Sequence, residues 1–244
     1  MSIVVKNLTK LFGTQKAVDN INFELKKGEI VGFIGPNGSG KSTTMKSICG
    51  ILTPNSGEIY VSGKNVAESE IEVKRQIGYL PENNPLYLDQ YVVEYLRYVA
   101  KTYKVARVNE RVNEIIELTG LSPERTKIIS QLSKGYKQRV GLAQAMIHNP
   151  NVLILDEPTT GLDPNQLTEI RELIKSIGKD KTVLLSTHIL QEVEAICDRV
   201  IMINNGIIVT DKSTDEVRKG DVSVQTIRVE FIEKVNTNDL ATIP

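Results

Sequence analysis

The sequence carries no excess of charge, because its 244 residues include 30 Lys and Arg and 30 Asp and Glu. Proteins that bind the nucleic-acid backbone usually have a basic excess, since they neutralise phosphates with Lys and Arg. No nucleic-acid partner is therefore expected. The chain also has no internal repeat and no low-complexity tract, which excludes a repeat architecture.

Long apolar runs and cysteine-based motifs are missing as well. No apolar run approaches the 18 residues that indicate a membrane span, so the chain is not expected to cross a membrane by itself. Residues 1–6 lack the apolar core of a signal peptide. The two cysteines, Cys49 and Cys197, have no CxxC pattern or metal-ligand spacing. Both fall in apolar helical stretches and are expected to be buried, reduced thiols in the cytoplasm.

What the chain does have is the composition of a globular protein, with 40% hydrophobic and 25% charged residues. Its length suits one large α/β domain, alone or with a small appendage. Residues 3–5, 21–25, 30–34 and 57–61 have the pattern of short strands separated by turns. They favour an antiparallel sheet packed beside the α/β core.

The phosphate-binding loop is the strongest motif of the chain. It fits G-x-x-x-x-G-K-[ST] and reads Gly35-Pro36-Asn37-Gly38-Ser39-Gly40-Lys41-Ser42-Thr43. Glycines let the backbone turn sharply and bring its N–H groups close to an anion. Lys41 supplies charge for the β- and γ-phosphates, and the Ser42 hydroxyl is a hard ligand for Mg²⁺. A buried strand over 30–34 and a helix over 41–49 flank the loop, as a phosphate site requires.

A second motif places two acids at the end of an apolar strand, residues 152–155, in the order Asp156-Glu157. Ligands of open α/β sheets bind beyond the carboxyl ends of the strands. Asp156 is therefore expected to hold Mg²⁺, directly or through water. Glu157 is expected to polarise the water that attacks the γ-phosphate, as a general base. The alternative is a strand that ends in two solvated acids.

Residues 85–149 have helical rather than strand-like spacing of their apolar residues, which predicts a helical subdomain. Helices are expected at about 90–103, 108–120 and 134–148, because apolar residues recur there at helical spacing. His148 ends the third helix, where a cation suits the helix dipole, and it is given no catalytic role. The α/β pattern then returns, with a helix at 165–178, a strand at 182–186 and a helix at 190–197. A hairpin around Asn205-Gly206 and a capping box at 213–216 follow.

The stretch Leu132-Ser133-Lys134-Gly135-Tyr136-Lys137-Gln138 resembles the signature motif of ATP-binding cassette (ABC) proteins. The order of the other motifs agrees with that family: phosphate loop, helical insertion, signature, acidic strand end, Gly161-Leu162-Asp163, and a histidine at His188. The resemblance covers residues 2–220. It implies an α/β P-loop NTPase fold with an antiparallel β subdomain and a helical subdomain, and an activity that hydrolyses ATP to ADP and phosphate with Mg²⁺.

The resemblance also implies a head-to-tail homodimer. In ABC proteins the signature of one subunit, here Ser133 and Gly135, closes over ATP on the phosphate loop of the other. Asp163 corresponds to the family's interface aspartate, and His188 to its switch histidine at the γ-phosphate. Phe12 matches the aromatic residue that stacks on adenine, with a core phenylalanine as the alternative reading. Without the resemblance, Ser133 would be read only as a helix N-cap.

Two departures from the family pattern stand out. Glu82 occupies the place of a glutamine that contacts Mg²⁺ and links the nucleotide site to the transmembrane partner. In the signature, Lys134 and Tyr136 replace a glycine and a glutamine. The Leu-Ser-Lys-Gly-Tyr and Leu-Pro-Glu stretches are similar to those of exporter-type subunits, including the ATP-binding subunit of the gliding-motility-associated transporter.

The expected organisation is a nucleotide-binding domain over 1–220 and a tail over 221–244, with the start of a truncated accessory domain as one reading of the tail. The chain is expected to lie on the inner face of the cell membrane and to work on a separate transmembrane permease. Five tyrosines, at 87, 91, 95, 98 and 103, point to a docking site, with Tyr91, Tyr95 and Tyr98 as one helical stripe. An adjacent stripe, expected to be core, is formed by Val92, Leu96, Val99 and Tyr103. Burial of both stripes is the alternative. A soluble ABC ATPase for cluster assembly, DNA or ribosomes, or a non-enzymatic nucleotide-gated scaffold, also remains open.

Overall fold

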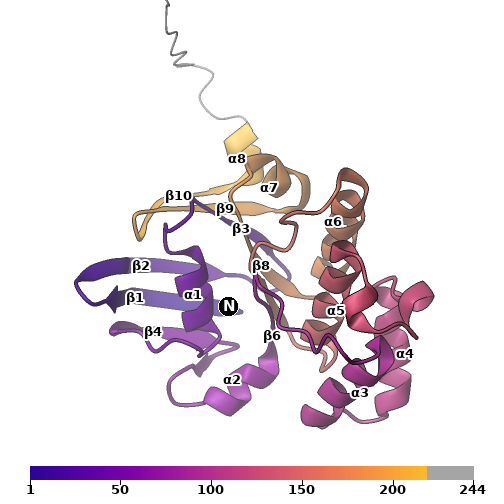
Figure 1. The fold of residues 1–244 in the computed structure, drawn as a ribbon. Coiled ribbons are helices and arrows are strands. Elements are labelled where there is room, and N and C mark those ends of the chain that lie inside the picture. Colours follow the sequence, from indigo (N-terminus) through magenta and orange to yellow (C-terminus); the bar gives the residue numbers. More distant parts are fainter. Residues whose placement is uncertain (219–244) are drawn as a thin grey trace, which may run out of the picture.

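Two sheets with a helix between them form the body of the protein (Figure 1), in a computed structural model that describes residues 1–218. The predicted tail at 221–244 lies outside the described residues. The larger sheet has the spatial order β10-β9-β3-β8-β7-β6, parallel throughout except for the antiparallel hairpin of β9 and β10. Its strands are β3 (Ile30–Ile34), β6 (Ile77–Leu80), β7 (Val152–Leu155), β8 (Thr182–Thr187), β9 (Arg199–Asn204) and β10 (Ile207–Ser213).

The smaller sheet is antiparallel, as the short strands predict, and has the order β2-β1-β4-β5. It is made of β1 (Ile3–Phe12), β2 (Gln15–Leu25), β4 (Ser56–Val61) and β5 (Lys64–Asn65). Grouping residues 30–34 with these strands is wrong, because β3 is a central strand of the larger sheet. All five of its residues are buried, and strands covered on both faces are typical of parallel sheets.

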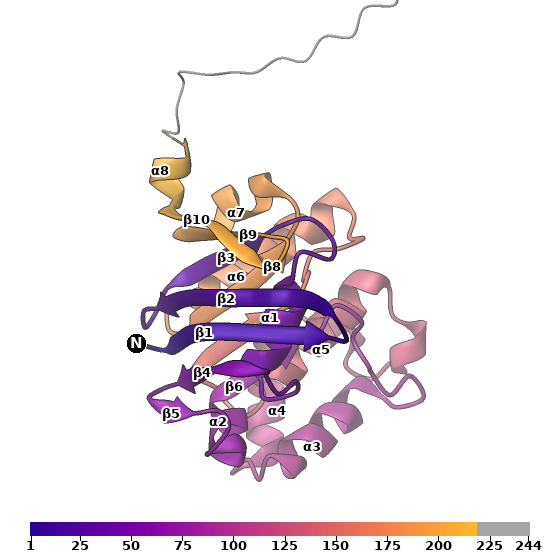
Figure 2. The ribbon, with the colours of Figure 1, turned by 90° about the vertical axis from the view of Figure 1, so that its left-hand side faces the viewer.

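Helices cover both faces of the larger sheet. They are α1 (Lys41–Ile48), α2 (Glu70–Gln76), α3 (Val92–Thr102), α4 (Val108–Leu118), α5 (Lys134–Met146), α6 (Pro164–Gly178), α7 (Leu190–Ile196) and α8 (Thr214–Arg218), with short 3₁₀ turns at Ser122–Glu124 and Ile129–Gln131. Figure 2 shows α1 behind the smaller sheet, and α3 and α4 at the far side of the molecule. None of the helices within residues 1–218 combines the length and hydrophobicity of a membrane span.

Two cores follow from the alternation of side chains along the strands. Val31 and Phe33 of β3 point towards α1 and the smaller sheet, where Met45 is also fully buried. Ile30 and Ile34 of the same strand belong to the other core, which α3 to α7 complete. Because the two faces of β3 pack in different cores, the loop that follows β3 lies between the two sheets, at the N-terminus of α1.

β6 is the one strand of the larger sheet that the sequence pattern does not predict. It has four residues and includes Gly78, so its apolar run is short. A Cβ at Gly78 would collide with the backbone carbonyl of Ala145, because α5 crosses the strand at this point. Glycine is therefore needed for the close approach of α5 and the sheet. Helix α2, which leads directly into β6, is also absent from the sequence prediction.

The predicted cationic role of His148 at the end of α5 is wrong. Burial lowers the pKa of His148 to about 4, so the ring is neutral at pH 7. Its Nε2 donates to the carbonyl of Ile77 at 3.0 Å. The cation at this helix end is Arg111, which donates from Nη2 to the carbonyl of Met146 at 2.8 Å and from Nε to that of Ile147 at 2.9 Å.

Both cysteines are buried and free, as predicted. Burial raises the pKa of each thiol, so neither is a reactive thiolate at neutral pH.

Candidate functional site

The predicted phosphate loop borders a cavity of about 240 Å³ at the carboxyl edge of the larger sheet. The cavity is lined by Ala17, Asn37, Gly38, Ser39, Gly40, Lys41, Ser42, Thr43, Glu82 and Glu157. Most of the predicted phosphate-binding residues therefore lie together with two of the predicted acids. Ala17, from β2, is a lining residue that no motif indicates.

The backbone of the loop requires its glycines. Gly38 and Gly40 have φ of 79° and 110°, a region that residues with a Cβ rarely adopt. A side chain at Gly35 would collide with the carbonyl of Ile203 and with Ser39. The loop then enters α1 at Lys41, and the first N–H groups of a helix have no partner within it. These donors and the positive end of the helix dipole favour an anion at this place.

Lys41 is buried and lies across the mouth of the loop. Its Nζ donates to the carbonyls of Gly35 at 2.7 Å and Pro36 at 3.3 Å. The carboxylate oxygen Oε1 of Glu157 lies 3.7 Å from the same Nζ. The Lys41 ammonium therefore sits between the loop and the predicted general base, within reach of a phosphate that the loop holds.

Asp156 joins the phosphate loop to the end of β8. Its Oδ1 accepts hydrogen bonds from Ser42 Oγ at 3.1 Å and from Ser186 Oγ at 2.6 Å. A hydroxyl and a carboxylate side by side are the hard oxygen donors that Mg²⁺ prefers, and Mg²⁺ keeps several of its waters when bound. The pair formed by Ser42 and Asp156 therefore fits this ion, with Glu82 on the wall of the same cavity. Within residues 1–218 no cluster of three or more His, Cys, Asp and Glu is suited to a metal ion.

Glu157 has a backbone φ of 49°, in the left-handed region that is unusual for a side chain of this kind. A hydrogen bond from its N–H to Ser186 Oγ, 2.9 Å long, supports this conformation. Its Oε2 is 3.0 Å from His188 Nδ1 and accepts from Thr160 Oγ1 at 3.1 Å. The other oxygen, Oε1, is buried without a hydrogen bond among the described residues, so it has acceptor capacity on the side of Lys41.

The remaining predicted site residues lie away from this cavity. Phe12, at the end of β1, is 51% exposed, so the alternative of a core phenylalanine is wrong. Ser133 caps α5 by accepting from the N–H of Tyr136 at 3.3 Å, and Asp163 caps α6 by accepting from that of Gln166 at 2.9 Å. Gly135 faces the Gln166 side chain. The signature and the Asp163 turn are thus neighbours of each other rather than of the phosphate loop of the same chain.

Comparison with known proteins identifies the family. A family model described as "ABC transporter" matches residues 18–160. The chain is 40% identical over 223 residues to the bacitracin transport ATP-binding protein BcrA of Bacillus licheniformis, covering 90% of this chain and 72% of BcrA. This chain belongs to the ABC transporter family.

Other members of the family agree. The probable multidrug ABC transporter ATP-binding protein YbhF of Escherichia coli is 37% identical over 219 residues, which span 88% of this chain but only 38% of YbhF. Among solved structures, the ATP-binding cassette MJ0796 in a dimeric, post-hydrolysis state with ADP and Pi has a TM-score of 0.79 and 28% identity. The match covers 87% of this chain and 98% of that one.

The expected fold, an ABC-type P-loop NTPase with an antiparallel sheet and helices, is confirmed by this likeness. The chain is an ABC ATPase, the ATP-binding subunit of a transporter, and hydrolyses ATP to ADP and phosphate. A non-enzymatic scaffold and a soluble ABC ATPase without a role in transport are therefore set aside.

Two polar residues of this ABC cassette contact the predicted acids without having been singled out in the sequence. Ser186 bonds to both Asp156 and Glu157, and Thr160 bonds to Glu157. A signal for Thr160 is its place three residues after Glu157. A signal for Ser186 is its position at the end of a buried strand, at the edge where Asp156 also lies.

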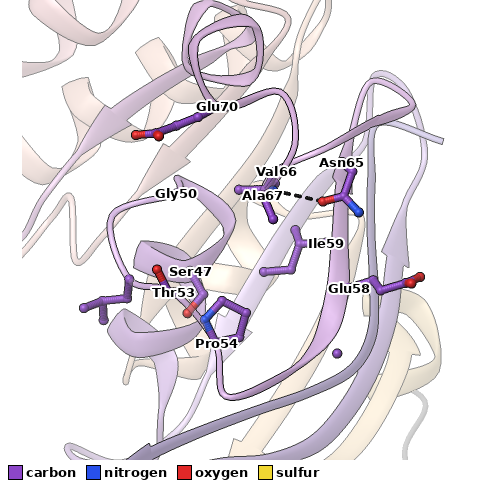
Figure 3. A pocket seen from close by; sticks show the side chains of 12 residues that line it. Ser47, Gly50, Thr53, Pro54, Glu58, Ile59, Asn65, Val66, Ala67 and Glu70 are labelled. Atoms are coloured by element: carbon purple, nitrogen blue, oxygen red, sulfur yellow. Dashed lines mark hydrogen bonds between the residues drawn. The ribbon is translucent and has the colours of Figure 1, made fainter.

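A second cavity, of about 300 Å³, opens beyond the far end of α1 and contains none of the predicted site residues of this ABC cassette (Figure 3). It lies among the end of α1, the loop that follows it, and β4. Ala67 N–H donates to Asn65 Oδ1 at 2.9 Å on its wall, so this amide oxygen is already engaged. The chemistry of the cassette lies at the smaller cavity, where the charged groups converge.

The tyrosines of the helical region are divided differently from the sequence prediction. Val92, Leu96 and Val99 are buried, as expected for the aliphatic stripe. Tyr95, placed in the exposed stripe, is only 3% exposed, and its hydroxyl bonds to Gln144.

The outer tyrosines remain exposed on this ABC cassette. Tyr103, placed with the aliphatic stripe, is partly exposed and stacks on His148, with ring centroids 3.9 Å apart. Tyr87, Tyr91 and Tyr98 are also exposed. The Tyr87 ring lies 5.8 Å from that of Tyr98, centroid to centroid.

Proposed function

We propose that this ABC ATPase powers export through a separate transmembrane permease, and that it does so as an ATP-dependent, head-to-tail homodimer with Mg²⁺. The observation that carries the proposal is the division of the site. The phosphate loop and Glu157 share one cavity, whereas Ser133, Gly135 and Asp163 lie outside it. Two copies arranged head to tail would bring the missing half to each nucleotide. The dimeric MJ0796 cassette with ADP and Pi supports this arrangement.

Within each site, we assign roles from the contacts. Lys41 binds the phosphates, and Phe12 stacks on the adenine ring. Ser42 and Asp156 hold Mg²⁺, with Glu82 beside them. The ion supplies positive charge that stabilises the phosphoryl oxygens when bound.

Glu157 orients and deprotonates the attacking water through Oε1, the oxygen that faces Lys41. His188 holds the other oxygen, Oε2, at 3.0 Å from its Nδ1. In this arrangement His188 can contact the γ-phosphate and hold the Glu157 carboxylate at the same time.

Export is the direction that a relative favours, because the Nod factor export ATP-binding protein I of Cupriavidus metallidurans is 32% identical over 228 residues, which span 92% of this chain. A role in a gliding-motility-associated transporter remains our more specific proposal, and it rests on the Leu-Ser-Lys-Gly-Tyr and Leu-Pro-Glu stretches. We also propose that residues 1–220 form the nucleotide-binding domain, with a helical subdomain at 85–149. The chain would lie on the cytoplasmic face of the membrane.

The permease is proposed to dock on an exposed aromatic surface made by Tyr87, Tyr91 and Tyr98. Tyr87, the first residue of this surface, follows Glu82 of the nucleotide cavity by five residues. Pro85, two residues before Tyr87, lines a cavity of about 370 Å³ together with Pro81 and Tyr103. Tyrosine gives a large contact area with little loss of rotamer freedom, which suits an interface.

Affinity purification of the chain from detergent-solubilised membranes of its native cells tests this proposal. We expect a multi-span membrane protein to co-purify. Replacing Tyr87, Tyr91 and Tyr98 together by Ser should reduce its recovery at least tenfold while ATPase activity and Tm hold. Val209→Ser is the matched control, since Val209 is an exposed apolar residue on β10, at the opposite edge of the sheet from β6. Full recovery with the triple variant would contradict the docking site, and recovery of soluble partners alone would contradict the permease.

A further inference from the structure

Glu192, on α7, is a buried carboxylate that the nucleotide cavity does not include. It is only 2% exposed, and acidic side chains are almost never buried to this degree unless they are paired. The nearest cation is Arg171 of α6, whose Nη2 lies 3.9 Å from Glu192 Oε1, too far for a hydrogen bond. The role of Glu192 is therefore to be inferred from its hydrogen bonds.

One oxygen of Glu192 receives two hydroxyl groups from different segments of the chain. Its Oε2 accepts from Thr159 Oγ1 at 2.8 Å and from Thr187 Oγ1 at 2.6 Å. Thr159 lies in the turn after β7, and Thr187 is the last residue of β8. Both threonines are buried, so Glu192 joins the turn after β7 to the end of β8 through two residues that are 28 positions apart in the sequence.

The next residue after each threonine contacts Glu157. Thr160 donates to Glu157 Oε2 at 3.1 Å, and His188 Nδ1 lies 3.0 Å from the same oxygen. Successive side chains of an extended chain point to opposite sides, which lets Thr187 face Glu192 while His188 faces Glu157. Two adjacent pairs of residues thus connect one oxygen of Glu192 to one oxygen of Glu157.

We infer that Glu192 is a positioning residue for ATP hydrolysis, which holds Thr160 and His188 in the places from which they fix the Glu157 carboxylate. The inference rests on the proposed role of Glu157 as the general base. Glu192 touches neither the cavity nor the phosphate loop, so its removal should disturb the orientation of the base and leave the binding of ATP intact. If Glu192 were needed only for the stability of α7, its removal would not affect turnover and ATP binding differently.

Kinetics of the purified 244-residue chain test the inference. Glu192→Ala should lower kcat about tenfold or more, with the Kd for ATP changed by less than about threefold. Glu192→Gln keeps a carbonyl oxygen able to accept both hydroxyls, so it should retain kcat within about threefold. Glu194→Ala is the matched control, an acidic residue of the same helix whose carboxylate makes no hydrogen bond or ion pair among the described residues. Equal losses in kcat and in ATP affinity for Glu192→Ala would contradict the inference.

A double-mutant cycle with Glu157→Gln separates positioning from general destabilisation. If Glu192 acts through Glu157, Glu192→Ala should change the residual rate of the Glu157→Gln variant less than about threefold. The same factor in both backgrounds would overturn the positioning role. Near-normal turnover of Glu157→Gln alone would instead overturn the role of Glu157. If Glu192→Ala does not fold, Thr159→Val replaces it in the test. Thr159→Val should lower kcat about threefold or more in the chain that has Glu157, and should not do so in the Glu157→Gln background.

Discussion

Acidification should destabilise this ABC cassette through His148, which the fold holds in its neutral form. Burial lowers the pKa of His148 from its ordinary value of 6.5 to about 4. The unfolded chain therefore binds a proton at a higher pH than the folded chain does. Between pH 6.5 and pH 4 the unfolded state holds more protons, so the free energy of unfolding falls as the pH falls through this window. Above it, the contribution of His148 is fully present.

The size of the effect follows from the shift and from the exposure of the ring. A shift from 6.5 to about 4 corresponds to about 3 kcal/mol at about 1.4 kcal/mol per unit. His148 is only partly buried, so solvent screening reduces this to about 1–2 kcal/mol. The hydrogen bond to the Ile77 carbonyl raises the pKa of His148, whereas the charges of Lys181 and Arg111 lower it further.

Urea unfolding at pH 7, 6, 5 and 4.5 measures this effect, with His148→Gln as the control. Glutamine does not titrate, and its amide has a donor for the carbonyl of Ile77. Carboxylates elsewhere titrate equally in both proteins, so the difference isolates His148. The wild-type chain should lose about 1–2 kcal/mol more than the variant between pH 7 and pH 4.5, or about 2–8 °C in Tm. Parallel losses in the two proteins would refute this reasoning.

Three further variants address the nucleotide site. Lys41→Ala should abolish hydrolysis and weaken ATP binding at least tenfold in a titration while the Tm holds, whereas Lys46→Ala, a half-buried lysine of the same helix that does not line the cavity, should do neither. Glu82→Gln should raise the Mg²⁺ concentration for half-maximal activity, because the loss of a carboxylate weakens hard-cation binding; unchanged Mg²⁺ dependence would remove Glu82 from the metal site. Glu157→Gln should sediment as a dimer with ATP and Mg²⁺, and Ser133→Arg added to it should return the monomer; a monomer in both cases would contradict the shared site.

The parts of the fold that the sequence predicts are those with a local signal. The strands at 30–34 and 152–155 are continuous apolar runs, and the helix at 164–178 begins with an Asp-Pro cap and ends at a glycine. The capping box at 213–216 is present, with Ser213 and Glu216 exchanging hydrogen bonds. β6 has no such signal, since its four residues are defined by their neighbours in the sheet and by α5.

The candidate site also has residues with a local sequence signal and residues without one. The phosphate loop is one continuous motif, so its residues and their shared cavity are predictable from local spacing. Contacts such as those of Ser186 with Asp156, or of Glu192 with Thr159, join residues about 30 positions apart. Serine and threonine at strand ends are common, and only the parallel order of β7 and β8 brings these side chains together.

The tyrosine stripe shows why helical spacing alone does not decide exposure. Tyr91, Tyr95 and Tyr98 share one stripe by their spacing, but α3 begins at Val92 and leaves Tyr91 at its cap. α5 packs against the middle of α3 and buries Tyr95. The exposed surface is instead completed by Tyr87, which lies in the loop before α3 and therefore outside the helix.

The steady-state rate of ATP hydrolysis by Glu157→Gln tests the central claim most directly, because one oxygen of this carboxylate faces Lys41 and the other is held by Thr160 and His188. The variant keeps the shape of the side chain and the phosphate loop, so ATP should still bind with nearly unchanged affinity. Its turnover should fall by about 10²-fold or more, because an amide cannot accept the proton of the attacking water. Turnover close to that of the unaltered chain would show that the hydrolytic base of this cassette is not Glu157.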